Sequence, residues 1–218
     1  MTRRGFFGGT FDPIHVGHLD VARAALAALG LDEVVLVPAN IPPHRSAPRA
    51  SASHRFAMAA LAVQFESRLL VSDLEMSAPG PSYTSATLDR LAGRGLDTRT
   101  LFLITGADAF HDIASWKDYP AILDRCHFVV VSRPDHGVAG LKAALPDLAG
   151  RTVNASHRPF AEPRIILVDA PTAAVSSTDI RRRVAEGASL DGLVPDAVAA
   201  HIRRHRLYQL GAPGELAT

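Results

Sequence analysis

Residues 8–18 read Gly8-Gly9-Thr10-Phe11-Asp12-Pro13-Ile14-His15-Val16-Gly17-His18, directly after the apolar pair Phe6-Phe7. A helical pattern follows, in which apolar residues recur every three or four positions before a terminating glycine: Leu19, Ala22, Leu26, Leu29 and then Gly30. A glycine-rich turn lets the backbone approach an anion, and the N-terminus of the next helix directs free N–H groups to the same place. The segment therefore predicts a strand–turn–helix unit that binds phosphate.

Further strands are predicted on the C-terminal side of this unit. Short apolar, β-branched runs occupy residues 33–37, 69–72, 100–105, 128–132 and 164–168. Segments with helical spacing separate these runs, and near-continuous apolar strands of this kind are typical of a parallel sheet covered on both faces. We therefore expect an α/β fold, a Rossmann-like doubly wound parallel sheet with helices on both faces and a C-terminal helical segment.

The same patterns predict helices at residues 53–67, 84–91, 107–115, 120–124, 178–186 and 195–206. Residues 38–48 and 78–81 are expected to be proline-rich loops. The weakly patterned residues 135–156 are expected to form an irregular insertion. No stretch is long enough to link two domains, so the chain is interpreted as one domain over residues 1–218, in which about 175–210 form the C-terminal helical part.

Composition excludes several classes of protein. Of 218 residues, 47% are hydrophobic and 21% are charged, which is typical of globular proteins and not of disordered or fibrous ones. The longest uncharged helical stretch, residues 56–65, is shorter than the ~18 apolar residues that a membrane span needs. A net charge of +1 gives no overall attraction to nucleic acid or membranes. The single cysteine, Cys126, excludes an internal disulfide and a cysteine-based zinc site and favours a cytoplasmic location.

Two histidines lie at the predicted helix entrance. His15 and His18 are three residues apart, so both side chains can face one point. Gly17 lies between them, and we expect its missing side chain to leave room for a phosphate.

A second candidate anion site is predicted near the C-terminus. In residues 175–181, Val-Ser-Ser-Thr-Asp-Ile-Arg, either Ser176 or Ser177 is suited to cap a helix. The first turn of that helix would then offer hydroxyl groups, free amides and Arg181 to an anion.

Both segments resemble motifs of the HxGH nucleotidyltransferase superfamily: residues 8–18 its phosphate-binding motif, and residues 176–181 its second motif, S-S/T-x-I-R. The resemblance implies that His15, His18 and Arg181 act catalytically on the nucleotide phosphates. The ATP-binding residues that it implies are Gly8, Gly9, Thr10, Phe11, His15, His18, Gly106, Asp108, Ser176, Ser177, Thr178 and Arg181.

Three more segments resemble one branch of that superfamily, the bacterial nicotinate mononucleotide adenylyltransferases. They are residues 37–45 (Val-Pro-Ala-Asn-Ile-Pro-Pro-His-Arg), residues 81–84 (Pro-Ser-Tyr-Thr), and Gly106-Ala107-Asp108 with Trp116. The resemblance implies that Trp116 stacks on the pyridine ring and that amides at Tyr83 and Thr84 meet the nicotinate carboxylate. It also implies that Gly106 and Asp108 hold the adenosine ribose. His44 and Arg45 would face phosphate.

What the resemblance implies is adenylyl transfer from ATP to nicotinate mononucleotide, giving deamido-NAD and pyrophosphate in NAD biosynthesis. Mg²⁺ would arrive with ATP, and no metal ligand from protein side chains is expected. The expected partners are these two small molecules, without nucleic acid or membrane, and a homo-oligomer stays open.

Other functions stay open at this stage. The acceptor could be nicotinamide mononucleotide or phosphopantetheine, since the two phosphate motifs do not select it. In a different chemistry, Asp12, His15 and His18 would be three ligands of a metallohydrolase. A nucleotide-binding regulator without turnover is the third class.

Overall fold

A computed structural model describes residues 2–43, 47–134, 136–156 and 160–209. Seven strands of these residues form one sheet, in the order β3-β2-β1-β4-β5-β7-β6, and all neighbouring strands are parallel. The strands are β1 (Arg4–Gly9), β2 (Glu33–Pro38), β3 (Leu69–Val71), β4 (Phe102–Gly106), β5 (His127–Val131), β6 (Thr152–Asn154) and β7 (Ile165–Val168).

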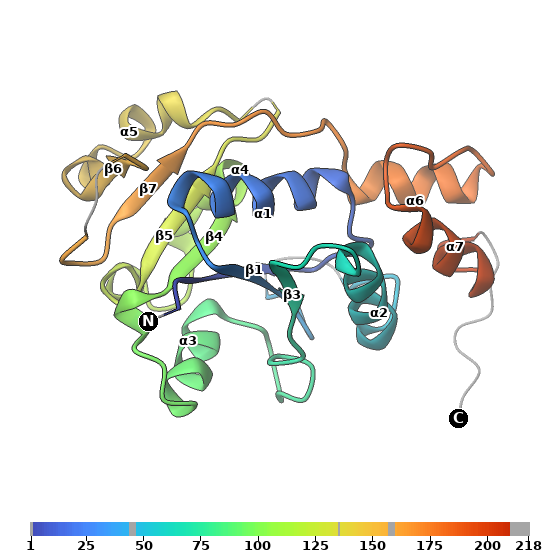
Figure 1. Ribbon diagram of the computed structural model, residues 1–218, viewed down its shortest axis with the longest axis horizontal. Coiled ribbons are helices and arrows are strands. Elements are labelled where there is room, and N and C mark those ends of the chain that lie inside the picture. The colour runs from blue at the N-terminus through green and yellow to red at the C-terminus, as the bar shows by residue number, and fades with distance from the viewer. Residues whose placement is uncertain (1, 44–46, 135, 157–159, 210–218) are drawn as a thin grey trace.

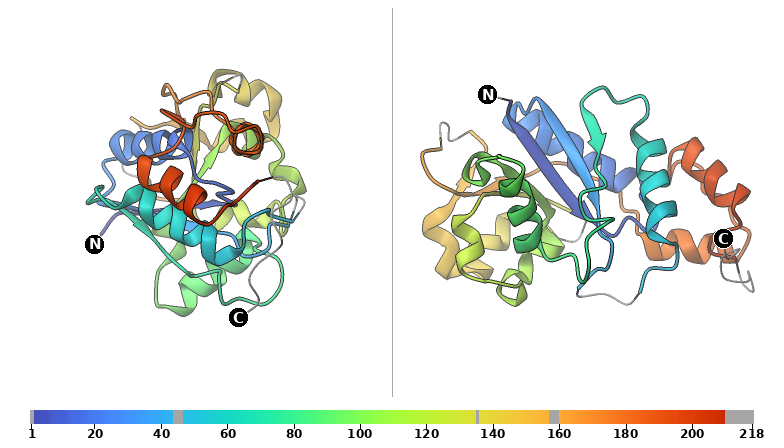
Figure 2. Two further views of the ribbon diagram at one scale, coloured as in Figure 1. Left: turned by 90° about the vertical axis from the view of Figure 1, so that its right-hand side faces the viewer. Right: turned by 90° about the horizontal axis from the view of Figure 1, so that it is seen from below.

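Helices cover both faces of this sheet. They are α1 (Val16–Leu29), α2 (Ala52–Val63), α3 (Thr84–Gly93), α4 (Ala107–His111), α5 (Leu141–Ala144), α6 (Ser177–Ala185) and α7 (Asp196–Arg204). Helix α1 lies along one face and α3 lies below the opposite face, while α6 and α7 lie beside α2 at the end of the molecule toward which β1 runs (Figure 1). The views in Figure 2 show the same separation of the two helix layers. This is the predicted doubly wound α/β fold.

Two apolar cores show why the helices divide in this way. Successive side chains of a strand point to opposite faces, so Phe6 and Phe7 of β1 enter different cores. Phe7 packs in the core that includes Met58 of α2 and Ile180 of α6. Phe6 packs in the other core, with Leu88 of α3. Ile180 of α6 and Val198 and Ile202 of α7 are buried in the first of these cores, so the C-terminal helical part packs against the rest of the domain.

The strand order reverses between β1 and β4, which are hydrogen-bonded neighbours. In doubly wound sheets ligands bind outside the carboxyl ends of the strands at such a point. Residues 8–18 comprise the end of β1, the loop after it and the start of α1, and β4 leads through Gly106 directly into α4. The fold thus brings the two predicted nucleotide-binding segments to one edge of the sheet.

One expectation about the fold was wrong. Residues 135–156 are not simply an irregular insertion, because they contain α5 and the edge strand β6. Strand β6 has only three residues and pairs with β7 through Thr152 opposite Ile165. A strand this short leaves no alternating pattern to read in the sequence, and only its partner β7 defines it.

Several helix boundaries also differ from the prediction. The helix predicted over residues 107–115 is α4 followed by a 3₁₀ turn, Ile113–Ser115, and residues Ala121–Asp124 form another 3₁₀ turn. Helix α2 ends at Val63, where the N–H of Glu66 turns back to the Val63 carbonyl at 2.8 Å. These are differences of helix type and length, and they leave the order of elements unchanged.

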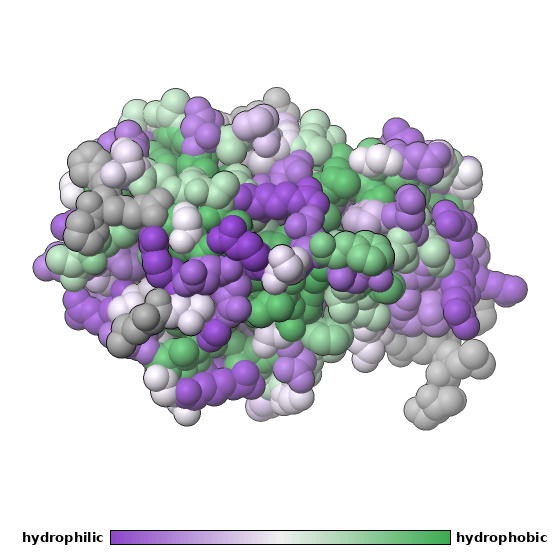
Figure 3. Space-filling view, in the orientation of Figure 1, coloured by the Kyte–Doolittle hydropathy of each residue, from purple (hydrophilic) through white to green (hydrophobic). Residues whose placement is uncertain are grey.

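Hydrophilic residues gather at the surface where α7 lies (Figure 3). Arg203 and Arg204 at the end of that helix are exposed to solvent. Throughout the described part of the chain, every helix is too short or too polar to cross a membrane.

Candidate active site

Gly8 and Gly9, the last two residues of β1, line a cavity. A side chain at Gly8 would meet no atom within 4 Å, so the missing side chain leaves open space there. Phe11, in the loop after β1, is 1% exposed. Its ring contacts the His18 ring edge-on, with ring centroids 5.0 Å apart. Phe7 in turn supports Phe11 at 5.6 Å. The loop backbone therefore rests on packed aromatic rings and faces the cavity.

His15 and His18 form one unit at the start of α1. Their rings stack with centroids 3.7 Å apart, as their spacing predicted. The backbone N–H of His15 donates to Nδ1 of His18 at 3.2 Å. Because an amide nitrogen can only donate, Nδ1 of a neutral His18 must accept, and Nε2 carries the proton.

The protonation of His15 follows from its burial. The side chain is 1% exposed, and this burial, with a smaller contribution from the positive charge of Arg133, lowers the pKa of His15 to about 3. His15 is therefore neutral at pH 7. Its Nδ1 is one of two buried side-chain nitrogens for which the described residues offer no hydrogen-bond partner. A buried polar atom of this kind is suited to contact a ligand.

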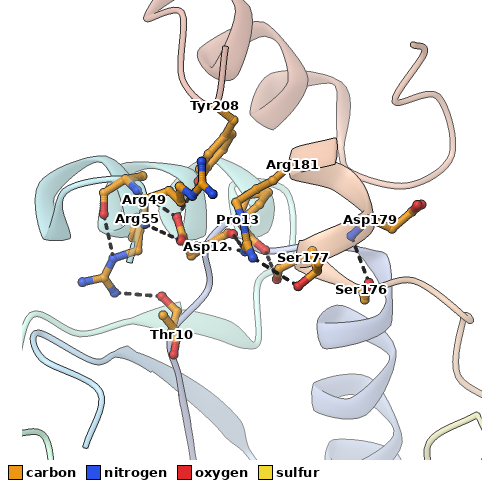
Figure 4. Close-up of polar contacts among 12 residues, drawn as sticks. Thr10, Asp12, Pro13, Arg49, Arg55, Ser176, Ser177, Asp179, Arg181 and Tyr208 are labelled. Carbon is orange, nitrogen blue, oxygen red and sulfur yellow. Dashed lines mark hydrogen bonds and ion pairs between the residues drawn. The ribbon is translucent and has the colours of Figure 1, made fainter. Parts of the chain in front are cut away.

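The serine-rich turn before α6 meets the loop after β1. Ser176 caps α6, its Oγ accepting from the N–H of Asp179 at 3.1 Å, as the sequence predicted. Ser177 Oγ donates to the carbonyl of Pro13 at 2.9 Å, and Arg181 Nη1 donates to the carbonyl of Asp12 at 2.7 Å (Figure 4). The two predicted phosphate sites, more than 150 residues apart in sequence, thus touch each other.

A cavity of about 820 Å³ lies between these turns and the loops after β2 and β4. Among its lining residues are all the predicted site residues that the structure describes: Gly8, Gly9, Thr10, Phe11, His15, His18, Tyr83, Thr84, Gly106, Asp108, Trp116, Ser176, Ser177, Thr178 and Arg181. His44 and Arg45, also predicted to bind, lie outside the described residues. The volume is of the size that ligand pockets have.

The acceptor side of the cavity is formed by the loop after β2 and the start of α3. Ser82 joins these two segments, because its Oγ accepts from the N–H of Asn40 at 2.9 Å and its N–H donates to the Ile41 carbonyl at 2.8 Å. Tyr83 and Thr84 begin α3, so first-turn amides lie at the cavity wall. Trp116 is half-buried and packs against Phe128 with ring centroids 6.2 Å apart, which leaves part of the indole at the cavity.

The structure gives a reason for Gly17 that the sequence did not predict. A Cβ at this position would lie 2.9 Å from the carbonyl oxygen of Ala173 and 3.2 Å from Nη1 of Arg133. The glycine is therefore needed where the start of α1 approaches the chain that follows β7. Crowding by protein atoms therefore explains a glycine here, and the space that it leaves for a phosphate stays a prediction.

Asp12 does not have the surroundings of a metal ligand. Its Oδ2 accepts from the N–H of Arg49 at 2.8 Å, and its Oδ1 accepts from the N–H of Ala50 at 3.1 Å and from the Tyr208 hydroxyl at 2.8 Å. Within the residues that the structure describes, His, Cys, Asp and Glu side chains form no group of three or more suited to a metal ion. The hypothesis of a metallohydrolase with Asp12, His15 and His18 as ligands is therefore not supported.

Several residues of the site were missed as site residues at the sequence level. Arg133, which follows β5, lines the cavity and donates to the Gly17 carbonyl at 2.9 Å. Glu75, 5% exposed, also lines the cavity and accepts from Thr87 Oγ1, and burial raises its pKa. An acidic residue in a polar loop gives no such signal, whereas the arginine after the fifth strand could have been found from its place at a strand end.

Arg55 is the most informative of the missed residues. Its side chain is 1% exposed and donates to four backbone carbonyls, those of Thr10, Ala39, Asn40 and Ala50. These carbonyls belong to the loops after β1 and β2, so one buried cation connects both loops that line the cavity (Figure 4). A charged residue inside the apolar pattern of α2 was the available signal.

Comparison with known proteins agrees with this geometry. The family model for cytidylyltransferase-like proteins matches residues 6–183. The chain is 43% identical over 206 residues to a protein of Roseiflexus sp. (strain RS-1) named "Probable nicotinate-nucleotide adenylyltransferase", an alignment covering 94% of this chain and 97% of that protein. A protein of Symbiobacterium thermophilum with the same name is 39% identical over 212 residues, 97% of each chain.

Solved structures show the same fold. The nicotinic acid mononucleotide adenylyltransferase of Plasmodium falciparum, complexed with NaAD, superposes with a TM-score of 0.75 and 18% identity, covering 95% of this chain and 98% of that one. The described chain belongs to the cytidylyltransferase-like family and, within it, to the nicotinate-nucleotide adenylyltransferases.

Proposed function

We propose that this protein transfers the adenylyl group of ATP to nicotinate mononucleotide, giving deamido-NAD and pyrophosphate, a step of NAD biosynthesis. The observation that carries this function is the direct contact of the two phosphate-binding turns. Ser177 and Arg181 donate to the backbone of the loop that contains His15, and both turns line one cavity with Trp116 at its other side. Relatives about 40% identical over almost the whole chain carry the name of this activity.

The reaction joins two anions and needs no general base. The 5′-phosphate of the acceptor has a second pKa near ~6, so it is already an anionic nucleophile at neutral pH. One of its oxygens forms a bond to the α-phosphorus of ATP while the bond from that phosphorus to the β-phosphate oxygen breaks, and pyrophosphate leaves with the electron pair. What the protein must supply is in-line placement and relief of charge repulsion.

The residues at the cavity supply donors and positive charge for that purpose. His18 presents a protonated Nε2 because its Nδ1 already accepts, and Arg181 and Arg133 contribute full positive charges. The amides at the start of α1 and α6 add the positive ends of two helix dipoles. Each donor aimed at growing negative charge is worth ~3 kcal/mol, or about two orders of magnitude in rate.

We propose that Mg²⁺ enters with ATP and that the triphosphate oxygens and water hold it. The phosphate side of the cavity presents arginines, imidazoles and amides, and the described residues form no acidic or histidine group suited to hold the ion. Mg²⁺ keeps much of its water and is bound largely by substrate phosphates in sites of this kind. When bound, the ion neutralises charge on the departing pyrophosphate, and the protein side chains orient the α-phosphate.

For the acceptor, we propose nicotinate over nicotinamide. Thr84 lies at the cavity wall in the first turn of α3, where backbone N–H groups have no partner within the helix, and N–H donors favour a carboxylate. A carboxamide would require an acceptor for its own N–H groups. We also propose a cytoplasmic location, because the single cysteine, Cys126, is buried and forms no disulfide within the chain.

One assay tests the function. Purified protein is incubated with ATP and Mg²⁺ together with nicotinate mononucleotide, nicotinamide mononucleotide or phosphopantetheine, and pyrophosphate release is measured. We expect the highest kcat/KM with nicotinate mononucleotide and a loss of release in His18→Ala. Faster turnover of phosphopantetheine, or ATP binding without pyrophosphate release from any acceptor, would exclude the proposed reaction.

A further inference from the structure

The carboxylate of Asp12 is the place where several segments of the site meet. Asp12 is 5% exposed and follows β1 in the phosphate-binding loop. Its two oxygens accept from the backbone of Arg49 and Ala50, in the loop after β2, and from the hydroxyl of Tyr208, after α7. Three of its acceptor positions are thus taken by N–H and O–H donors from two distant segments. A carboxylate held in this way can orient neighbours but is not placed to accept a proton from a substrate.

Arg181 of α6 contacts Asp12 through both its main chain and its carboxylate. Its Nη1 donates to the Asp12 carbonyl at 2.7 Å and lies 3.8 Å from Oδ2 of the same residue. Its Nη2 donates to Thr178 Oγ1 at 3.1 Å. The guanidinium has five N–H groups in a rigid plane, so two fixed contacts set the direction of the others. Arg181 lines the cavity, and its orientation there depends on where Asp12 lies.

Tyr208, which donates to Asp12, has an unusual backbone conformation. Its φ is +66°, a left-handed conformation that a tyrosine rarely adopts. Such a conformation persists where the surrounding contacts hold it, and such residues cluster at functional sites. Burial and the adjacent Asp12 carboxylate raise the pKa of Tyr208, so the hydroxyl stays protonated and donates at 2.8 Å (Figure 4).

We propose that Tyr208 is a positioning residue for catalysis: its hydroxyl fixes Asp12, and the carbonyl and carboxylate of Asp12 together orient Arg181 toward the triphosphate of ATP. This role rests on the proposed adenylyl transfer. It assigns to the chain after α7, which lies far from the phosphate motifs in sequence, a direct part in the geometry of the site.

The first experiment separates the hydroxyl from the packing of the same segment. Tyr208→Phe keeps the ring and removes only the hydroxyl. Leu207→Ala is the matched control, because Leu207 packs on the same core and its truncation weakens the segment while leaving Tyr208 intact. We expect Tyr208→Phe to lower kcat about tenfold, with KM for nicotinate mononucleotide little changed, since small misplacement of a charged group costs rate. Leu207→Ala should lower the unfolding temperature without this loss of kcat.

The second experiment asks whether Tyr208 acts through Arg181. In an Arg181→Lys background the planar guanidinium is gone, so adding Tyr208→Phe should lower kcat by less than about twofold. Asp12→Asn keeps the side-chain volume and changes the carboxylate, and it should reproduce the kcat loss of Tyr208→Phe. This variant also tests the idea if Tyr208→Phe proves unstable.

The outcomes decide between positioning and simple stability. Equal kcat losses in Tyr208→Phe and Leu207→Ala would show a structural role and overturn the proposal, as would unchanged kcat in Tyr208→Phe, or full additivity with Arg181→Lys. Failure of the proposed function is distinct, because the wild-type protein would then release no pyrophosphate with nicotinate mononucleotide. An active wild type with an equally active Tyr208→Phe variant refutes the positioning role alone.

Discussion

The N–H of His15 donates to Nδ1 of His18, and the two imidazoles stack with centroids 3.7 Å apart. This single hydrogen bond decides which nitrogen of His18 can serve a phosphate. Since Nδ1 accepts, the neutral ring carries its proton on Nε2. The backbone of one histidine thus selects the tautomer of the other.

Because Nε2 of His18 carries the proton, we expect substitutions of His18 to differ in how much kcat they retain. Glutamine places an amide nitrogen near the position of Nε2, whereas asparagine places it near Nδ1. We expect His18→Gln to keep more kcat than His18→Asn or His18→Ala, and the alanine variant to lose about a hundredfold, the usual worth of one aimed donor. Steady-state kinetics with both substrates measures this. An alanine variant altered in KM alone would mean that His18 binds without stabilising the transition state.

Burial of His15 predicts loss of stability in acid. In the unfolded chain its pKa is 6.5, and in the folded protein it is about 3. Between these values the unfolded state binds a proton that the folded state does not, so stability falls as pH decreases from about 6.5 toward 3. At pH 4 the loss is about 3 kcal/mol. Urea unfolding at pH 7 and pH 4 tests this value.

The variant His15→Asn is the control for that measurement. His127, whose pKa burial lowers to about 4, changes stability in the same direction in both proteins. The His15→Asn variant should therefore lose less stability on acidification than the wild type. The same loss in both proteins would mean that His15 titrates normally.

We expect different effects from substitution of Gly8 at the end of β1 and of Gly17 at the start of α1. Alanine at Gly17 would press its Cβ against the Ala173 carbonyl, which lies 2.9 Å away, and a backbone atom cannot easily move. Alanine at Gly8 meets no atom within 4 Å of its Cβ. We expect Gly17→Ala to destabilise the protein by ~1–3 kcal/mol, and Gly8→Ala to leave stability unchanged while raising KM for ATP. Thermal unfolding and kinetics of the two variants check this, and equal stability would contradict the stated role of Gly17.

We expect substitution of Arg55 to lower the free energy of unfolding strongly, although this residue lies away from the reacting atoms. Arg55→Met leaves the buried carbonyls of the two loops without their donor, at a cost of about 3 kcal/mol. Arg68→Met is the matched control, because Arg68 also donates to carbonyls, those of Leu31 and Asp32, but lies exposed. Chemical unfolding should show less than about 1 kcal/mol for that control. Similar losses of unfolding free energy in both variants would mean that the buried hydrogen bonds of Arg55 stabilise the protein no more than the exposed ones of Arg68.

We expect substitution of Trp116 to change KM for the acceptor and not KM for ATP. Part of the indole packs against Phe128, and part lies at the cavity wall. We expect Trp116→Ala to raise KM for nicotinate mononucleotide about tenfold, because stacking on an aromatic ring is worth ~1–3 kcal/mol, while KM for ATP changes little. Trp116→Phe keeps an aromatic face and should recover much of the loss. Equal increases in both KM values would place Trp116 in the core only.

Most of the fold could be predicted because its signals are local. The strands β1, β2, β4, β5 and β7 are continuous apolar runs, and the glycines at positions 30 and 187 end helices in left-handed conformations. Strand β6 could not be predicted, because its three residues become a strand only by pairing with β7. The site residues that the resemblance implies could be named for the same local reason, since they lie in short motifs, and those that the structure describes all line the cavity.

The supporting contacts had no local signal. The hydroxyl of Tyr208 and the carboxylate of Asp12 are 196 positions apart in sequence, and the Arg55 contacts span both loops. Hydrogen bonds of this kind depend on which segments the sheet brings together, and one sequence does not contain that information in any short window.

The amino-acid sequence by itself predicted most of the strands and helices, the two candidate phosphate-binding turns and the family, because the signal for each lies in a stretch of about ten neighbouring residues. Only the tertiary structure decided that these turns touch, that His18 is protonated on Nε2, that Gly17 lies against the Ala173 carbonyl, and that Arg181 donates to the Asp12 carbonyl. Each of these depends on distances between atoms of separate segments, and packing of the two cores against the sheet sets those distances.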